Sequence, residues 1–131
     1  MSRKNVEIVR EIHDAWARGD FALGSDRLAP EFEWHQFPQA VEPGTRRGAE
    51  VGESFRRVFE VYEDVRVDSS EFIEADDKVI VVGRVFATAR GSGMPLDSPI
   101  AFVWTLRDGK LVRNELFTDR QEALEAAGVR E

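Results

Sequence analysis

The segment PIAFVWTL, residues 99–106, decides the fold class, because it is apolar at odd and even positions alike. Successive side chains of a strand point to opposite faces, so this pattern predicts a central strand that is covered on both sides. The pair Asp108-Gly109 follows, and it favours a two-residue hairpin turn in which both positions have positive φ. Residues 111–117 are therefore predicted to return as the antiparallel partner strand.

A short helix is predicted directly after this hairpin. Asp119 can accept a hydrogen bond from a free amide of the first helical turn, and Glu122 completes an Asp-x-x-Glu capping box. Apolar residues at positions 123, 124, 126 and 127 form the body of this helix, and Gly128 is of the residue type that ends helices.

Upstream of residue 91, the spacing of apolar residues predicts six further elements. Helical spacing predicts three helices, at residues 6–18, 21–29 (closed by Pro30) and 49–62. Alternation predicts three strands, at residues 31–37, 65–74 and 78–90. In the first of these strands, alternation puts Phe32, Trp34 and Gln36 on one face and Glu33, His35 and Phe37 on the other. The segment 38–48 contains several proline and glycine residues and is predicted to be a loop.

Helices and longer strands therefore segregate along the chain, which indicates an α+β fold in a single domain spanning residues 1–131. We expect a strongly curved, mainly antiparallel mixed sheet that wraps around the N-terminal helices as a cone, with a pocket at its mouth. Two strands with apolar residues on both faces need cover on both sides. A second copy of the chain is the simplest source of the outer cover, so a homodimer through the sheet face is expected.

Composition excludes several partner classes. A formal net charge of −7 argues against nucleic acid or an anionic membrane as the main partner, because both attract clustered Lys and Arg. The sequence has no apolar run near the ~20 residues that cross a bilayer. The absence of cysteine excludes disulfides and thiolate chemistry, and the charged first residues lack an apolar signal core. We therefore expect a cytoplasmic protein.

Several short motifs occur in an order that is shared with a known family. They are AWARGD (15–20), EWH (33–35), PGTRRGAE (43–50), GSGMP (91–95), DGK (108–110) and DRQEALEAAG (119–128). On these motifs the chain resembles the SnoaL-like branch of the nuclear-transport-factor-2-like (NTF2-like) superfamily. The superfamily includes polyketide cyclases, epoxide hydrolases, ketosteroid isomerase, dehydratases and many domains without a known reaction, so the fold alone does not name the chemistry.

The resemblance implies a small hydrophobic organic ligand, no cofactor and, if the protein is an enzyme, acid–base chemistry of the cyclase/isomerase or epoxide-hydrolase type. The alternative is a non-catalytic ligand-binding or dimerisation module. Ketosteroid isomerase chemistry is disfavoured, because its base position falls near Gln36 and Phe37 and its oxyanion tyrosine falls near Ile12. Glutamine and phenylalanine cannot abstract a proton at neutral pH, and isoleucine cannot donate a hydrogen bond to an oxyanion.

Asp119 is the candidate general base, since SnoaL-like cyclases place an aspartate just before the last helix. Apolar neighbours such as Phe117 would raise its pKa, but the N-cap role alone also explains this residue. His35 is the candidate partner for proton transfer near neutral pH. An epoxide-hydrolase-like set would consist of Arg84, Glu115 and Asp119, provided that Arg84 faces inward. Otherwise Glu115 pairs with neighbours on an exposed face.

The chain is rich in aromatic residues for one small domain, and a cone with a cavity would draw some of them onto its lining. The expected substrate-binding residues are Trp16, Trp34, Phe55, Phe59, Arg84, Phe102, Trp104 and Phe117. His13 shares a helix face with Ile12 and Trp16 and is expected to be structural. Two histidines far apart in the sequence, with no ligand spacing around them, predict no metal site.

Overall fold

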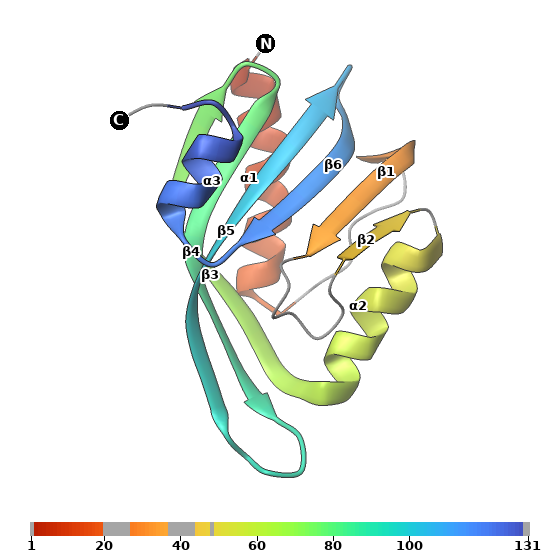
Figure 1. Cartoon of the computed structure of the whole chain (residues 1–131), viewed down its shortest axis with the longest axis vertical. Helices are drawn as coiled ribbons and strands as arrows, with labels where there is room; N and C mark the ends of the chain where they lie inside the picture. The colour runs from red at the N-terminus through yellow and green to blue at the C-terminus, as the bar shows by residue number, and fades with distance from the viewer. Residues whose placement is uncertain (1, 20–26, 37–43, 48, 130–131) are drawn as a thin grey trace.

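The structure is a computed structural model of the chain, and it describes residues 2–19, 27–36, 44–47 and 49–129. Three helices and six strands occur in this part of the chain (Figure 1). In chain order they are α1 (Ser2–Ala17), β1 (Leu28–Gln36), β2 (Gly44–Arg47), α2 (Ala49–Val61), β3 (Tyr62–Ala75), β4 (Lys78–Ala89), β5 (Pro95–Arg107), β6 (Lys110–Phe117) and α3 (Arg120–Ala126).

The six strands form one curved sheet in the order β2-β1-β6-β5-β4-β3 (Figure 1). Strands β1 and β6 pair in parallel, and the other four pairs are antiparallel. The sheet is therefore mixed, and the predicted α+β class is confirmed.

The sheet packs against helices on both of its faces (Figure 1). The face that packs against α1, called here the inner face, carries the larger hydrophobic core. Strand β5 contributes Ile100, Phe102, Trp104 and Leu106 to this core, and α1 contributes Val9, Ile12 and Trp16. The opposite, outer face packs against α3. Alternation along β5 thus divides one apolar segment between two cores, as the sequence of residues 99–106 predicts.

Helix α3 covers part of the outer face from within the same chain. Its Ala123 and Leu124 are fully buried in a cluster with Ile80 of β4 and with Ala101 and Val103 of β5. On the sequence alone, we expect a second copy of the chain to cover this face. These positions do not need it, because α3 already covers them. The homodimer and the cytoplasmic location remain predictions.

Two predicted elements differ from the structure at the start of the sheet. The helix predicted at 21–29 lies mostly outside the described residues, but its end is wrong, because Leu28 and Ala29 belong to β1 and Pro30 lies within that strand. The pairing of β1 with β6 is irregular between residues 28 and 33, which accommodates a proline that cannot donate to the ladder. The loop predicted at 38–48 contains β2, a strand too short to show alternation.

The turn, the N-cap and the terminal glycine predicted in the last third of the chain are confirmed, but the described structure shows no hydrogen bond from the Asp119 amide to Glu122 that would complete the capping box. Asp108 and Gly109 have φ values of 53° and 77°, as a two-residue hairpin turn with positive φ at both positions requires. The Asp119 side chain caps α3 by accepting a hydrogen bond from the backbone amide of Gln121 at 3.1 Å. Gly128 follows the helix with a φ of 79°.

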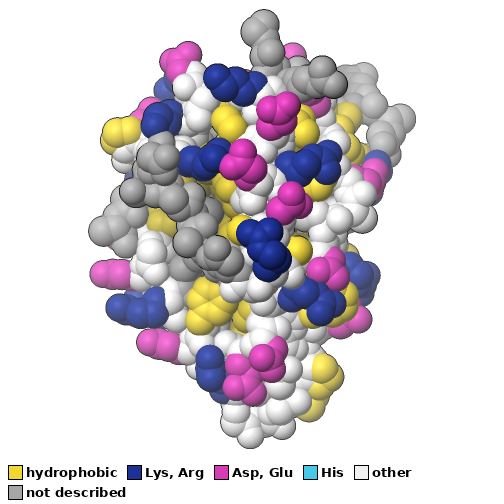
Figure 2. Space-filling model, turned by 180° about the vertical axis from the view of Figure 1, so that it is seen from behind, with side chains coloured by type: hydrophobic (Ala, Val, Ile, Leu, Met, Phe, Trp, Pro, Cys, Tyr) yellow, Lys and Arg dark blue, Asp and Glu magenta, His cyan; other side chains and the backbone are white. Residues whose placement is uncertain are grey.

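The surface is charged without a large region of one sign on the face seen from behind. Figure 2 shows Lys and Arg side chains interspersed with Asp and Glu side chains over this face. Among the described residues, no helix is long and apolar enough to cross a membrane.

Candidate functional site

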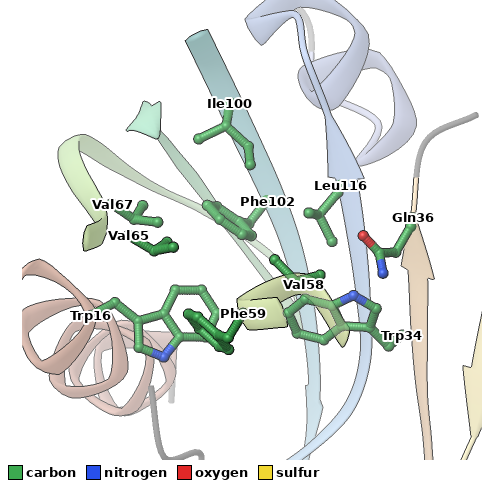
Figure 3. Close-up of a pocket in the computed structure, with 10 residues that line it drawn as sticks. All are labelled: Trp16, Trp34, Gln36, Val58, Phe59, Val65, Val67, Ile100, Phe102 and Leu116. Atoms are coloured by element: carbon green, nitrogen blue, oxygen red, sulfur yellow. The ribbon is translucent and has the colours of Figure 1, made fainter. Parts of the chain in front are cut away.

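A partly open cavity of about 110 Å³ lies between the inner face of the sheet and helices α1 and α2 (Figure 3). The residues that line it come from six elements. They are Trp16 (α1), Trp34 and Gln36 (β1), Val58 and Phe59 (α2), Val65 and Val67 (β3), Ile100 and Phe102 (β5), and Leu116 (β6).

Aromatic rings form much of the cavity wall. The ring centroids of Trp16 and Trp34 lie 6.3 Å apart, and those of Trp16 and Phe102 lie 5.5 Å apart. Phe59 projects from α2 between the two indoles in the view of Figure 3. Aliphatic side chains from β3, β5 and β6 complete the wall. Flat apolar walls of this kind favour a ring-shaped guest.

Gln36 brings an amide to this apolar lining. Its Nε2 donates a hydrogen bond of 3.1 Å to the Oγ of Ser54, a fully buried residue of α2. This bond orients the side chain and leaves Oε1 to accept a hydrogen bond from a ligand. None of the ten lining residues of the described structure is ionisable.

His13 lies in the aromatic core that adjoins the cavity and is 1% exposed. The indole Nε1 of Trp104 donates to His13 Nε2 at 2.9 Å, so the ring proton sits on Nδ1, which is 3.3 Å from the Oγ of Ser69. Burial lowers the pKa of His13 from 6.5 to about 3. His13 is therefore neutral at physiological pH. Its hydrogen bond with Trp104 joins α1 to β5 within the core, which agrees with its expected structural role.

Four of the predicted substrate-binding residues line the cavity: Trp16, Trp34, Phe59 and Phe102. Trp104 is fully buried in the same aromatic core, with its ring centroid 6.1 Å from that of Trp34. The side chain of Phe55 lies outside the described part of the structure.

Arg84 and Phe117 lie on the outer face, so the expectation that they line the cavity is wrong. Arg84 is opposite Pro99, in the same alternation as the outer-facing Ile80, and its Nε is paired with Asp97 Oδ1 at 2.8 Å. Phe117 is opposite Ala101 and packs against the cluster beneath α3. The inward-facing Arg84 that an epoxide-hydrolase-like set requires is therefore not present.

The three candidates for proton transfer, Asp119, His35 and Glu115, are also away from the cavity. In the strand register, Glu115 is opposite Val103 on β5 and His35 on β1, which puts both candidates on the outer face. Asp119 is exposed and caps α3. The structure therefore brings His35 and Glu115 together on the outer face but separates all three residues from the cavity.

His35 belongs to a hydrogen-bonded network at the β1–β2 end of the outer face. Its Nε2 donates to Glu33 Oε1 at 2.8 Å, and its Nδ1 accepts from the Thr45 hydroxyl at 2.9 Å. Arg47 Nε donates to the other Glu33 oxygen at 2.9 Å. The hydrogen bonds from His35 and then from Arg47 hold the pKa of Glu33 below its ordinary value. This network explains His35 as a residue that joins the edge strand to β1.

Substitution of Asp119 tests whether its capping hydrogen bond stabilises the folded protein. Asp119→Ala is expected to lose about 1 kcal/mol of unfolding free energy, because the Gln121 amide loses its acceptor. Asp119→Asn retains an acceptor oxygen and should stay close to wild type. Urea denaturation of the three proteins measures the difference, and equal losses in both variants would contradict the capping role.

Sequence reasoning missed six of the lining residues: Gln36, Val58, Val65, Val67, Ile100 and Leu116. Alternation in residues 31–37 already put Gln36 on the same face as Trp34, so this residue could have been found. The other five are aliphatic positions of ordinary core type, and only the assembled fold shows that they border a cavity. Within the described ranges, no cluster of three or more His, Asp or Glu side chains is arranged to hold a metal ion.

Comparison with solved structures finds the same fold in several proteins. TerC, co-crystallised with polyporic acid, is 26% identical with a TM-score of 0.75, and the match covers 95% of this chain and 98% of TerC. An NTF2-like protein from Burkholderia thailandensis is 31% identical with a TM-score of 0.78, over 95% of this chain and 97% of that protein. A putative SnoaL-like polyketide cyclase from Jannaschia is 22% identical with a TM-score of 0.74, over 99% and 95%.

The search of curated proteins finds no match. The family model described as SnoaL-like domain matches residues 9–114, which include five of the six strands and most of the cavity lining. On this match and on the shared fold, the chain belongs to the SnoaL-like family of NTF2-like proteins.

Proposed function

We propose that this protein binds a small, flat, largely apolar organic molecule in the cavity between α1, α2 and the inner face of the sheet. The observation that carries this proposal is the lining itself, in which apolar and aromatic walls surround a single amide at Gln36. Apolar cavities with few polar groups are typical of small-molecule sites.

The size of the cavity limits the part of the ligand that it holds. An engineered apolar protein cavity of about 150 Å³ binds benzene. The cavity here has a volume of about 110 Å³ and is partly open, so it suits one ring, and any larger part of the ligand extends toward the opening. The co-crystal of TerC with polyporic acid supports this proposal, because it shows that a protein of the same fold takes a small organic molecule.

Ligand binding is better supported than acid–base catalysis in this cavity. Proton transfer to or from a bound molecule needs an ionisable group within hydrogen-bond reach. The described lining has no such group, and His35, Glu115 and Asp119 lie on the outer face or at its edge. The lining therefore supports a non-catalytic ligand-binding module better than it supports a cyclase-like or an epoxide-hydrolase-like enzyme.

Filling the cavity tests the proposal. Val58→Phe adds a ring at a lining position of α2 and is expected to weaken toluene binding at least about tenfold, because the new ring takes the space of the guest. Val61→Phe is the matched control, since Val61 is on the same helix and is 40% exposed. It should bind toluene like wild type.

Binding is measured by calorimetry and by tryptophan fluorescence. The three tryptophans of the chain all lie in or beside the cavity wall, so their emission should report a bound ring. The proposal fails if wild type does not bind toluene or a comparable ring, or if Val58→Phe and Val61→Phe bind it equally well.

A further inference from the structure

The described cavity wall is apolar except at Gln36. The other nine lining residues of the described structure have aromatic or aliphatic side chains. Gln36 lies at the end of β1 and is half-buried, so its amide gives up part of its hydration on folding. Burial of a polar group is unfavourable unless a hydrogen bond replaces the lost water. An amide at this position therefore needs a partner for its nitrogen and a partner for its oxygen.

The two ends of this amide have different surroundings. The Nε2 of Gln36 donates to the Oγ of Ser54, which is fully buried in α2, whereas Oε1 accepts no hydrogen bond from the described part of the chain. In the view of Figure 3, the nitrogen points toward Val58 on α2, and the oxygen points toward Leu116 on β6. Leu116 is itself a lining residue. The oxygen therefore borders the space that a ligand would occupy.

The bond between β1 and α2 explains only half of the amide. It uses one N–H of Gln36 and leaves both lone pairs of the carbonyl oxygen. Because Ser54 holds the nitrogen on the side of α2, the oxygen is fixed on the opposite side of the amide plane. A fixed acceptor in an otherwise apolar wall sets the orientation of a bound molecule and selects one that carries a hydrogen-bond donor.

We propose that Gln36 determines the specificity of the cavity by accepting a hydrogen bond from the ligand, and that the ligand is a neutral ring bearing a hydroxyl group. Ser54 acts as a positioning residue, since it touches the amide of Gln36 and does not line the cavity. This inference rests on the proposed function. Charged ligands are disfavoured, because no described lining residue carries a charge to offset their desolvation.

Phenol and toluene form a matched pair of probes, because they have nearly the same size and differ in the hydroxyl group. The measured quantity is the ratio of phenol affinity to toluene affinity by calorimetry, which cancels most changes in cavity shape. In Gln36→Leu this ratio is expected to fall about fivefold to tenfold relative to wild type, the factor that one net hydrogen bond supports, with toluene binding retained. An unchanged ratio would overturn the role of Gln36.

Pyridine and benzene test which end of the amide meets the ligand. Neutral pyridine has the size of benzene and can accept a hydrogen bond but cannot donate one. If the oxygen of Gln36 faces the ligand, the ratio of pyridine affinity to benzene affinity should be the same in wild type and in Gln36→Leu. A fall in the pyridine ratio without a fall in the phenol ratio would overturn the assignment to Oε1, because the nitrogen would then be the group that meets the ligand.

Ser54→Ala tests the positioning role. Without the Ser54 hydroxyl the amide of Gln36 can turn, so the phenol-to-toluene ratio is expected to fall part of the way toward the Gln36→Leu value. A wild-type ratio in Ser54→Ala would contradict this role. Gln121→Leu is the matched control, because it makes the same substitution at an exposed position of α3. It should bind both probes like wild type.

A second readout works on the wild-type protein and does not depend on the folding of Gln36→Leu. The chain has three glutamines, Gln36, Gln39 and Gln121, so selective ¹⁵N labelling of glutamine gives three side-chain amide signals. Gln36→Glu, which has nearly the same shape as wild type, identifies the Gln36 signal by its loss. Phenol is expected to shift this signal more than toluene does, with Gln121 as the internal reference, and equal shifts would overturn the proposal.

The outcomes separate this inference from the proposed function. If wild type binds neither phenol nor toluene, the proposed function fails. If it binds both, and Gln36→Leu keeps the wild-type ratio, only the role of Gln36 is refuted.

Discussion

Between pH 7 and pH 4, wild-type protein is expected to lose about 3 kcal/mol more unfolding free energy than a His13→Gln variant, given the pKa of His13 near 3. Glutamine keeps an acceptor for the indole of Trp104 and a donor toward Ser69, but it does not titrate near these pH values. The comparison therefore isolates the imidazole from the carboxylates, which titrate in both proteins.

The sign follows from the two protonation states. Burial among Trp16, Phe102 and Trp104 lowers the folded-state pKa of His13 to about 3, whereas the unfolded-state value is 6.5. Below pH 6.5 His13 binds a proton in the unfolded chain but not in the folded chain. The free energy of unfolding therefore falls with falling pH until the folded-state pKa is reached. Well above pH 6.5 both states are neutral at this position, and the effect disappears.

Urea denaturation at a series of pH values checks this expectation. The difference in unfolding free energy between wild type and His13→Gln should be constant above pH 7 and should narrow or reverse steadily below pH 6. Parallel profiles for the two proteins would show that His13 takes up its proton in the folded state. Such a result would contradict the closed aromatic environment that the structure gives this residue.

Much of the fold was predictable, because its signals are local. The double-sided apolar pattern of residues 99–106, the Asp108-Gly109 turn and the Asp119 cap each depend on residues close together in the chain. The same signals identify α3, although they do not show that it would cover the outer face. That cover comes from tertiary packing of Leu124.

The direction of the β6 side chains was not predictable, because a single irregularity reverses it. The hairpin pairs Arg107 with Lys110 and Leu106 with Leu111, but the pairing then shifts so that Thr105 is opposite Arg113. Without this bulge, Glu115 would be opposite Phe102 on the inner face. A one-residue shift moves a whole strand segment to the other face, so Glu115 and Phe117 point outward.

The pairing of β1 with β6 illustrates the same limit. Gln36 was put on the face of Trp34 by alternation within one strand, which is a local rule. The position of Asn114 beside Trp34 depends on the parallel pairing of β1 with β6, two strands that are far apart in the sequence. No local pattern encodes that register, so the buried position of Asn114 opposite Trp34 could be recognised only in the assembled sheet.

Gly83→Ala is expected to destabilise the protein by about 3 kcal/mol, because there is no space for a methyl group at this position. Gly83 is buried in β4 opposite Ser69, next to an irregularity in β3. A Cβ added here would lie 2.1 Å from the backbone carbonyl oxygen of Asp68. Backbone atoms cannot rotate away as a side chain can, so β3 must move, and with it the Ser69 contact to His13.

Gly52→Ala is expected to have the opposite effect and to stabilise the protein. Gly52 is exposed within α2, and a Cβ added there would have no atom within 4 Å. Alanine removes backbone freedom from the unfolded chain, so this variant should gain about 0.5–1 kcal/mol. Urea denaturation of both variants measures the contrast. A Gly83→Ala protein as stable as wild type would show that β3 and β4 do not approach as closely as the structure requires. The position of the cavity wall that Val65 and Val67 of β3 form would then be wrong as well.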